Sequence, residues 1–187
     1  MPILGILASS RPAFELVGSY DSLATITVGT AVSSITFAGI PSGYKHLQLR
    51  MLTRDNAAQS GSQSQMQFNG VTGTSYNWHI LQGDGASASA SGGSGSTTYI
   101  YGFDRTTAAS NTASVFGVDI VDILDYANTN KNKTIRALGG YDANGSGMVK
   151  FASGLFNSTN AITSISISLQ SGGSYVQYSQ FALYGIK

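Results

Sequence analysis

The chain has 187 residues, of which only 10% are charged, and its formal net charge is +1. A nucleic-acid surface needs clustered Lys and Arg to replace counterions along the phosphates, and no such cluster occurs. The chain has no Cys, which excludes a disulfide framework and a thiolate metal site, and it has no run near the roughly 18 apolar residues of a membrane span. We therefore expect no nucleic-acid partner, no membrane span and no cofactor.

The first 18 residues contain two prolines and begin with the apolar side chains Ile3, Leu4, Ile6 and Leu7. This stretch lacks the positively charged start of a signal peptide and its apolar part is very short, so we expect it in the mature protein. Because an exposed apolar segment is a liability in water, residues 1–18 are predicted to be an extended arm that anchors on its own domain or on a neighbouring chain. Residues 19–187 are predicted to form a single domain.

Apolar and polar residues alternate with period two from Ser22 to the C-terminus, which is the pattern of strands. The clearest case is 164–170, where Ile and Leu alternate with Ser. The other expected strands are 24–28, 35–37, 46–51, 65–68, 76–82, 97–103, 113–123, 133–138, 148–155 and 176–184. About eleven short strands without a sustained helix predict an all-β fold, an antiparallel jelly-roll-like sandwich.

Three segments depart from this pattern. Within 118–123, and again within 176–183, the apolar residues change from odd to even positions or the reverse, which predicts a bulge in each segment. A helix over 118–126 is an open alternative for the first segment. Residues 83–96 are almost wholly Gly, Ala and Ser and offer no core face, so they are predicted to be a long flexible loop.

The residue types that carry catalysis are sparse and scattered. His46 and His79 fall in unrelated strands without acidic residues at ligand spacing, and the chain has a single Glu in the arm. The acidic cluster Asp119, Asp122 and Asp125 cannot share one strand face, because Asp122 has the opposite parity. The start of a calcium loop at 142–147 lacks its closing Glu and contains the hairpin signal Asn-Gly. The sequence therefore predicts no catalytic residue, no metal site and no enzyme.

Two further groups have both a functional and a packing interpretation. Lys131 and Lys133 are flanked by Asn and are interpreted as a solvated hairpin loop. The aromatic residues Tyr76, Trp78, Tyr99 and Tyr101 flank the Gly/Ser segment and are candidates for contact with a protein or a glycan, since aromatic rings suit stacking and hydroxyl hydrogen bonds. Packing within the domain is the alternative for most of these rings.

Several stretches resemble small virion proteins of tailed bacteriophages. They are MPILGILASS at the start, ITFAGIP at 35–41 leading into YKHLQLR at 44–50, FNG at 68–70 followed by Tyr76, DYANTNKNKT at 125–134 and the closing LYGIK at 183–187. The resemblance covers most of the chain and rests on strand and turn patterns. It implies a non-enzymatic component of the particle surface, located in the virion, and it transfers no catalytic residues.

Two functions follow from that resemblance. The first is a capsid decoration or cement protein that stabilises the head lattice, expected as a homotrimer in contact with the major capsid protein and anchored by its arm. The second is a tail fibre or receptor-binding module that holds host-surface glycans. The compact domain without heptads or collagen-like repeats favours the first.

Overall fold

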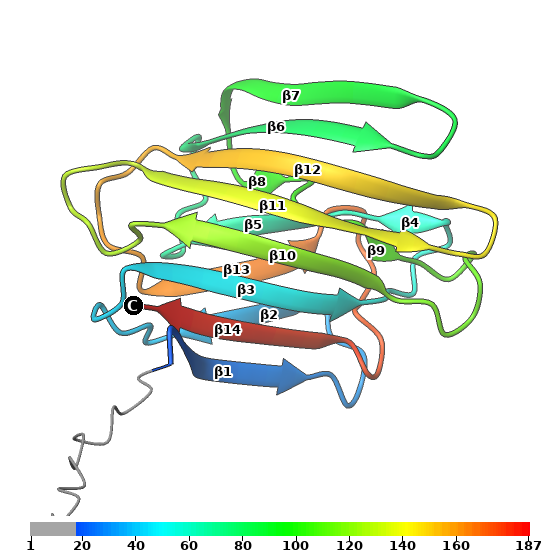
Figure 1. The fold of residues 1–187 in the computed structure, drawn as a ribbon, viewed down its shortest axis with the longest axis horizontal. Helices are drawn as coiled ribbons and strands as arrows, with labels where there is room; N and C mark the ends of the chain where they lie inside the picture. Colours follow the sequence, from blue (N-terminus) through cyan, green and yellow to red (C-terminus); the bar gives the residue numbers. More distant parts are fainter. Residues whose placement is uncertain (1–17) are drawn as a thin grey trace, which may run out of the picture.

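Antiparallel strands form every element of the described chain, which is residues 18–187 of a computed structural model (Figure 1). The largest sheet has eight strands, in the spatial order β1 (Tyr20–Thr27), β14 (Gln180–Ile186), β3 (His46–Thr53), β10 (Gly117–Leu124), β11 (Lys133–Asp142), β12 (Gly147–Phe156), β6 (Tyr76–Gly83) and β7 (Ala88–Thr97). The second sheet has the order β2 (Ser34–Ala38), β13 (Ser164–Leu169), β5 (Ser64–Phe68) and β8 (Ile100–Tyr101). A short third sheet pairs β4 (Gly61–Ser62) with β9 (Thr106–Thr107).

One apolar core lies between the two larger sheets, and Figure 1 shows the four-stranded sheet behind the eight-stranded one. Successive side chains of a strand point to opposite faces, so every second residue enters this core. In β13 the buried residues are Ile165, Ile167 and Leu169, as the alternation of Ile and Ser predicts. The predicted antiparallel β-sandwich is confirmed, and its jelly-roll topology stays a prediction.

Most of the predicted strands are confirmed, but the arm falls outside the structural description. Every region predicted as a strand contains at least part of one, although 97–103 holds little more than the two-residue β8. The arm's apolar residues Ile3, Leu4, Ile6 and Leu7 lie outside the described residues, so its anchoring role stays a prediction. No helix long and apolar enough to span a membrane occurs within residues 18–187.

The prediction of a long loop over 83–96 is wrong, because most of this segment forms β7. β7 pairs with β6 along the free edge of the large sheet. A strand at this edge needs no core side chains, since the backbone ladder alone holds it. Its glycines are needed there, because a Cβ at Gly92 or Gly93 would collide with the side chains of His79 or Trp78.

The bulge predicted within 118–123 and the alternative helix are also wrong. β10 is a regular strand whose register with β3 and with β11 runs without a shift. The apolar phase slips because both faces of the strand carry apolar residues, with Val121 and Ile123 buried and Val118 and Ile120 exposed. The change in the parity of the apolar residues within 176–183 has a different origin. Tyr178 lies in a turn with a positive φ, and β14 begins only at Gln180, so the segment is not one continuous strand.

The hairpin turn predicted from Asn-Gly is confirmed between β11 and β12. The amide of Ala143 donates to the carbonyl of Ser146 over 2.7 Å, and Asn144 and Gly145 both have positive φ. Two consecutive residues with positive φ match the right-handed twist of the flanking strands. The hairpin therefore continues the large sheet without a break.

Candidate binding surface

The histidines do not assemble a metal or catalytic site within the described chain. His46 lies on β3 and accepts a hydrogen bond at Nδ1 from the amide of Asp125 (2.9 Å), while His79 is exposed on β6. No three His, Asp or Glu side chains of residues 18–187 gather in a way that could hold a metal ion. These histidines therefore act as single strand residues.

The structure brings together two carboxylates that the sequence did not place side by side. Asp104 and Asp119 are both fully buried, near the buried Lys150. Asp104 accepts hydrogen bonds from the amide and the hydroxyl of Ser64, over 2.6 and 2.5 Å. Asp119 accepts one from the amide of Arg105 (3.1 Å), and its second oxygen has no partner. Asp119 and Lys150 face inward on either side of Gly139, which has no side chain to separate them.

Burial controls the protonation of this buried network. It raises the pKa of Asp104, and together with the charge of Asp104 it holds the pKa of Asp119 well above its usual range. Burial also lowers the pKa of Lys150 to about 8. A pair of carboxylates with raised pKa values is common in active sites. Here, however, both carboxylates are fully buried, at 0% exposure.

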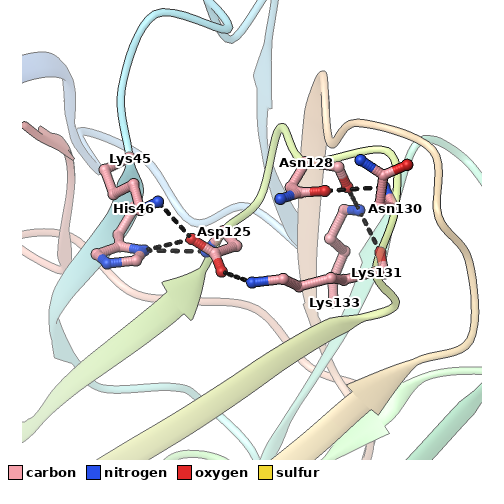
Figure 2. Close-up of polar contacts among 7 residues, drawn as sticks. All are labelled: Lys45, His46, Asp125, Asn128, Asn130, Lys131 and Lys133. Carbon is pink, nitrogen blue, oxygen red and sulfur yellow. Dashed lines mark hydrogen bonds and ion pairs between the residues drawn. The ribbon is translucent and has the colours of Figure 1, made fainter.

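Two lysines where the β10–β11 loop meets β11 have opposite environments: Lys131 lies in the loop, and Lys133 is the first residue of β11 (Figure 2). Lys131 is exposed and its ammonium contacts Asp125 over 2.6 Å, as the prediction of a solvated loop requires. Lys133 is fully buried, which corrects that prediction, and its ammonium donates to the carbonyls of Asn128, Lys131 and Thr159. The signal was present in the sequence, because Lys133 shares its parity with the inward residues of β11.

The four aromatic candidates occupy different environments. Tyr76 is fully buried, where its ring stacks on Phe156 with 4.9 Å between centroids and its hydroxyl donates to the carbonyl of Val71. Trp78, Tyr99 and Tyr101 are half-buried and contact one another edge to face, at 5.2 Å for Trp78–Tyr101 and 6.3 Å for Tyr99–Tyr101. Tyr76 is thus a core residue, and contact of the other three with a partner stays a prediction.

The outer face of the large sheet, turned toward the viewer in Figure 1, carries the largest group of exposed apolar side chains in the described chain. Each of its members is between 39% and 60% exposed. They are Leu52 on β3, Val118 and Ile120 on β10, Leu138 on β11, Val149 and Phe151 on β12, and Leu81 on β6. We call this group the apolar half-face.

Strand register arranges the apolar half-face in two rows across the strands. The first row runs Leu52, Val118, Gly140, Val149, Gly83 and Ala88. The second runs Arg50, Ile120, Leu138, Phe151, Leu81 and Ala90. Hydrogen-bonded neighbours in such rows lie roughly 5 Å apart, so their side chains form a continuous surface.

A polar row borders the apolar half-face on one side. Arg136 pairs with Asp122 over 2.9 Å, and the amide of Gln48 donates to the same carboxylate over 2.8 Å. Arg50 donates to Gln48 (2.8 Å) and its guanidinium lies over the ring of Tyr184. The outer face is thus divided between a hydrogen-bonded polar half and an apolar half without polar partners in its centre.

Two of the depressions on the apolar half-face lie along its first row. One, of about 570 Å³, is lined by Val118, Ile120, Leu138, Gly140 and Val149 among others. The second, of about 340 Å³, lies between Leu81, Gly83, Val149 and Phe151. Both depressions include a glycine of the first row, where the sheet presents no side chain. A flat apolar surface with such hollows suits another protein surface with projecting side chains.

The sequence contained one signal for the apolar half-face, which is the phase slip in β10. A strand that is apolar on both faces is typical of a strand covered on both sides. Comparison of the chain with known protein families, with curated proteins and with solved structures finds no match. The assignment of a function therefore depends on the geometry of this surface.

Proposed function

We propose that this chain is a non-enzymatic structural protein of a tailed bacteriophage particle, and that it acts there as a decoration or cement protein on the capsid. The observation that supports this function is the apolar half-face. Its seven side chains, each about half exposed, present on the order of 600 Å² of hydrocarbon, the upper end of what a monomer carries. Such a surface gains free energy when another protein covers it.

The role of a decoration protein explains both halves of the outer face. The apolar half offers contact area to a neighbouring protein subunit, while the hydrogen-bonded border around Asp122 and Arg136 forms the polar rim of that contact. Attachment to the major capsid protein is assigned to the N-terminal arm, which the resemblance to virion proteins implies. Catalysis is not required, and the buried carboxylates are interpreted as structural.

Purified particles of the encoding phage provide the test. Mass spectrometry is expected to find a copy number comparable with that of the major capsid protein, and cryo-electron microscopy is expected to locate the protein on the head. Phe151→Asp on the apolar half-face is expected to reduce incorporation. Ser153→Asp, on the same strand and the same face but in the polar half, is the matched control. A protein found only on the tail, or in none of the particles, would overturn the proposal.

A glycan-binding module of a tail fibre is the second candidate, favoured by the surroundings of Trp78. A depression of about 470 Å³ is lined by Trp78, His79, Thr134, Ser153 and Leu155 among others. It combines an aromatic ring with hydroxyl groups, the residue types that hold sugars by stacking and hydrogen bonding. The indole N–H of Trp78 is buried without a hydrogen-bond partner.

A glycan array tests this second candidate. Binding to host-surface glycans that is lost in Trp78→Ala and kept in Tyr178→Ala would support it, since Tyr178 is an exposed aromatic residue in a turn outside this depression. Absence of binding to glycans and to host cells would exclude it and leave the capsid role.

A further inference from the structure

We propose that the apolar half-face is the interface of a symmetric dimer, in which a second copy of this chain packs face to face with a two-fold axis running across the strands at the level of Gly139. This deepens the proposed assembly role, on which it rests. The occupant is a second copy because the surface is complementary to itself in shape and in charge.

The two rows of the half-face differ in the size of their side chains. Over β10, β11, β12 and β6 the first row reads Val, Gly, Val, Gly, and the second reads Ile, Leu, Phe, Leu. At each strand the larger side chain thus stands beside a smaller one, two residues away on the same face. The result is a ridge next to a trough.

A two-fold axis between the rows places the ridge of each copy in the trough of the other. Leu138 of one copy then faces Gly140 of the second, and Leu81 faces Gly83. Gly140 lines one depression of the half-face and Gly83 lines another, so each receiving hollow is already present. In a symmetric dimer each contact between two residues occurs twice, once on either side of the axis. Interdigitated side chains fill the space between two sheets packed about 10 Å apart.

The charged side chains of β11 on the outer face fit the same two-fold symmetry. Arg136 and Asp142 lie on β11 at equal sequence distances on either side of Gly139, and both are exposed on the outer face. The two-fold axis brings Arg136 of one copy next to Asp142 of the other, at both ends of the interface. A parallel stacking without this symmetry would instead place like charges opposite each other.

The area is sufficient for a stable pair. Roughly 600 Å² of hydrocarbon plus the surrounding polar rim approaches the approximately 800 Å² that each partner buries in a standard interface. A single extended segment lying on the face would fit less well, because its backbone amides and carbonyls would lose water without gaining partners. A second sheet arrives with its own backbone hydrogen bonds satisfied.

The oligomeric state of the full chain in solution tests this dimer. Sedimentation and light scattering are expected to give a dimer for the native protein, and Leu138→Asp is expected to raise its dissociation constant about a hundredfold, because the charge enters the interface twice. Thr134→Asp, on the same strand and face but in the polar half, is expected to remain a dimer. Circular dichroism verifies that both variants keep the native fold.

A charge exchange tests the position of the two-fold axis. Asp142→Arg places two arginines together and is expected to weaken the dimer. Asp142→Arg combined with Arg136→Asp is expected to restore it when Asp122→Asn also removes the carboxylate that pairs with Arg136 within each copy. A native monomer, a dimer unaffected by Leu138→Asp, or failure of the exchange to restore association would each overturn the proposed interface. A trimer would also overturn it and would support the homotrimer expected from the sequence. Since particle composition is measured separately, the dimer can fail while the virion role stands.

Discussion

The two faces of the large sheet reverse the usual arrangement at the level of Gly139. On the inner face Asp119 and Lys150 flank this glycine and are buried. On the outer face the neighbouring positions are Leu138 and Val149, which are exposed. A sheet optimised only for the stability of a monomer would carry the charges outside and the hydrocarbon inside. The comparison supports the proposal that the outer face makes a contact, and it indicates that the inner face tolerates polar groups because of local space and hydrogen bonds.

The largest effect on the free energy of unfolding is expected at Gly139, where the inner face has least room for an added atom. Gly139→Ala would add a methyl group that overlaps the carboxylate of Asp119, against the backbone of Val118. We expect a loss of about 3 kcal/mol in the free energy of unfolding, as for an overpacked core. Urea denaturation measures it, and Gly29→Ala is the control because a Cβ at Gly29 meets no atom within 4 Å. Equal stability of the two variants would show that the inner face is not tightly packed around Asp119.

The next largest effect on the free energy of unfolding is expected at Lys133, a buried charged residue at the opposite end of the same inner face. Lys133→Met removes the ammonium that donates to three carbonyls of the surrounding loops. Loss of charge-assisted hydrogen bonds is expected to reduce the free energy of unfolding by roughly 2 kcal/mol. Lys131→Met removes only an exposed ion pair and is expected to change stability by less than about 0.5 kcal/mol. Similar losses in the two variants would contradict the structural role of Lys133.

A pair of identical residues on β10 compares the two faces directly. Val121 is buried in the core and Val118 is 54% exposed on the half-face. Val121→Ala is expected to lower the free energy of unfolding by about 2 kcal/mol, and Val118→Ala by less than about 0.5 kcal/mol when measured below the concentration at which the chain associates. The same Val118→Ala is expected to weaken association. If Val118→Ala destabilised the monomer as much as Val121→Ala, the outer face would belong to the fold itself.

The sequence predicted the fold more completely than the surface. Alternation located β13 and most other strands because a strand buried on one face alternates visibly. β7 escaped because an edge strand of Ala, Ser and Gly has no apolar face to detect. The shift of apolar residues within 118–123 predicts a bulge or a helix, since periodicity cannot distinguish either from a strand that is apolar on both faces.

The buried network was beyond prediction for a different reason. Asp104 lies outside the regular strands and Asp119 lies on β10, so only the packing of the two sheets brings them together. The aromatic candidates show the same limit. Tyr76 and Trp78 share a strand and a parity, yet Tyr76 is fully buried in the core and Trp78 is only partly buried against it.

The effect of Asp119 on stability depends on pH and is smallest at acid pH. Because burial holds its pKa well above the usual range, the folded state binds this proton more tightly than the unfolded state. Its contribution to stability is therefore complete at acid pH and is lost as the pH rises from the ordinary carboxyl pKa through the folded one. Asp119→Asn resembles the protonated form, so near pH 3, below the ordinary carboxyl pKa, it is expected to change the free energy of unfolding by less than about 0.5 kcal/mol.

At higher pH the variant is expected to exceed the native protein in stability, because it has no carboxylate to ionise inside the sandwich. Urea denaturation at pH 3 and pH 8 measures the difference. Asp125→Asn is the opposite control, since the hydrogen bond from Lys131 lowers the pKa of Asp125 and its contribution is present only above the ordinary carboxyl pKa. Loss of stability in Asp119→Asn at pH 8 would mean that Asp119 is ionised in the fold. In that case the inner face would hold a carboxylate whose charge is balanced by Lys150.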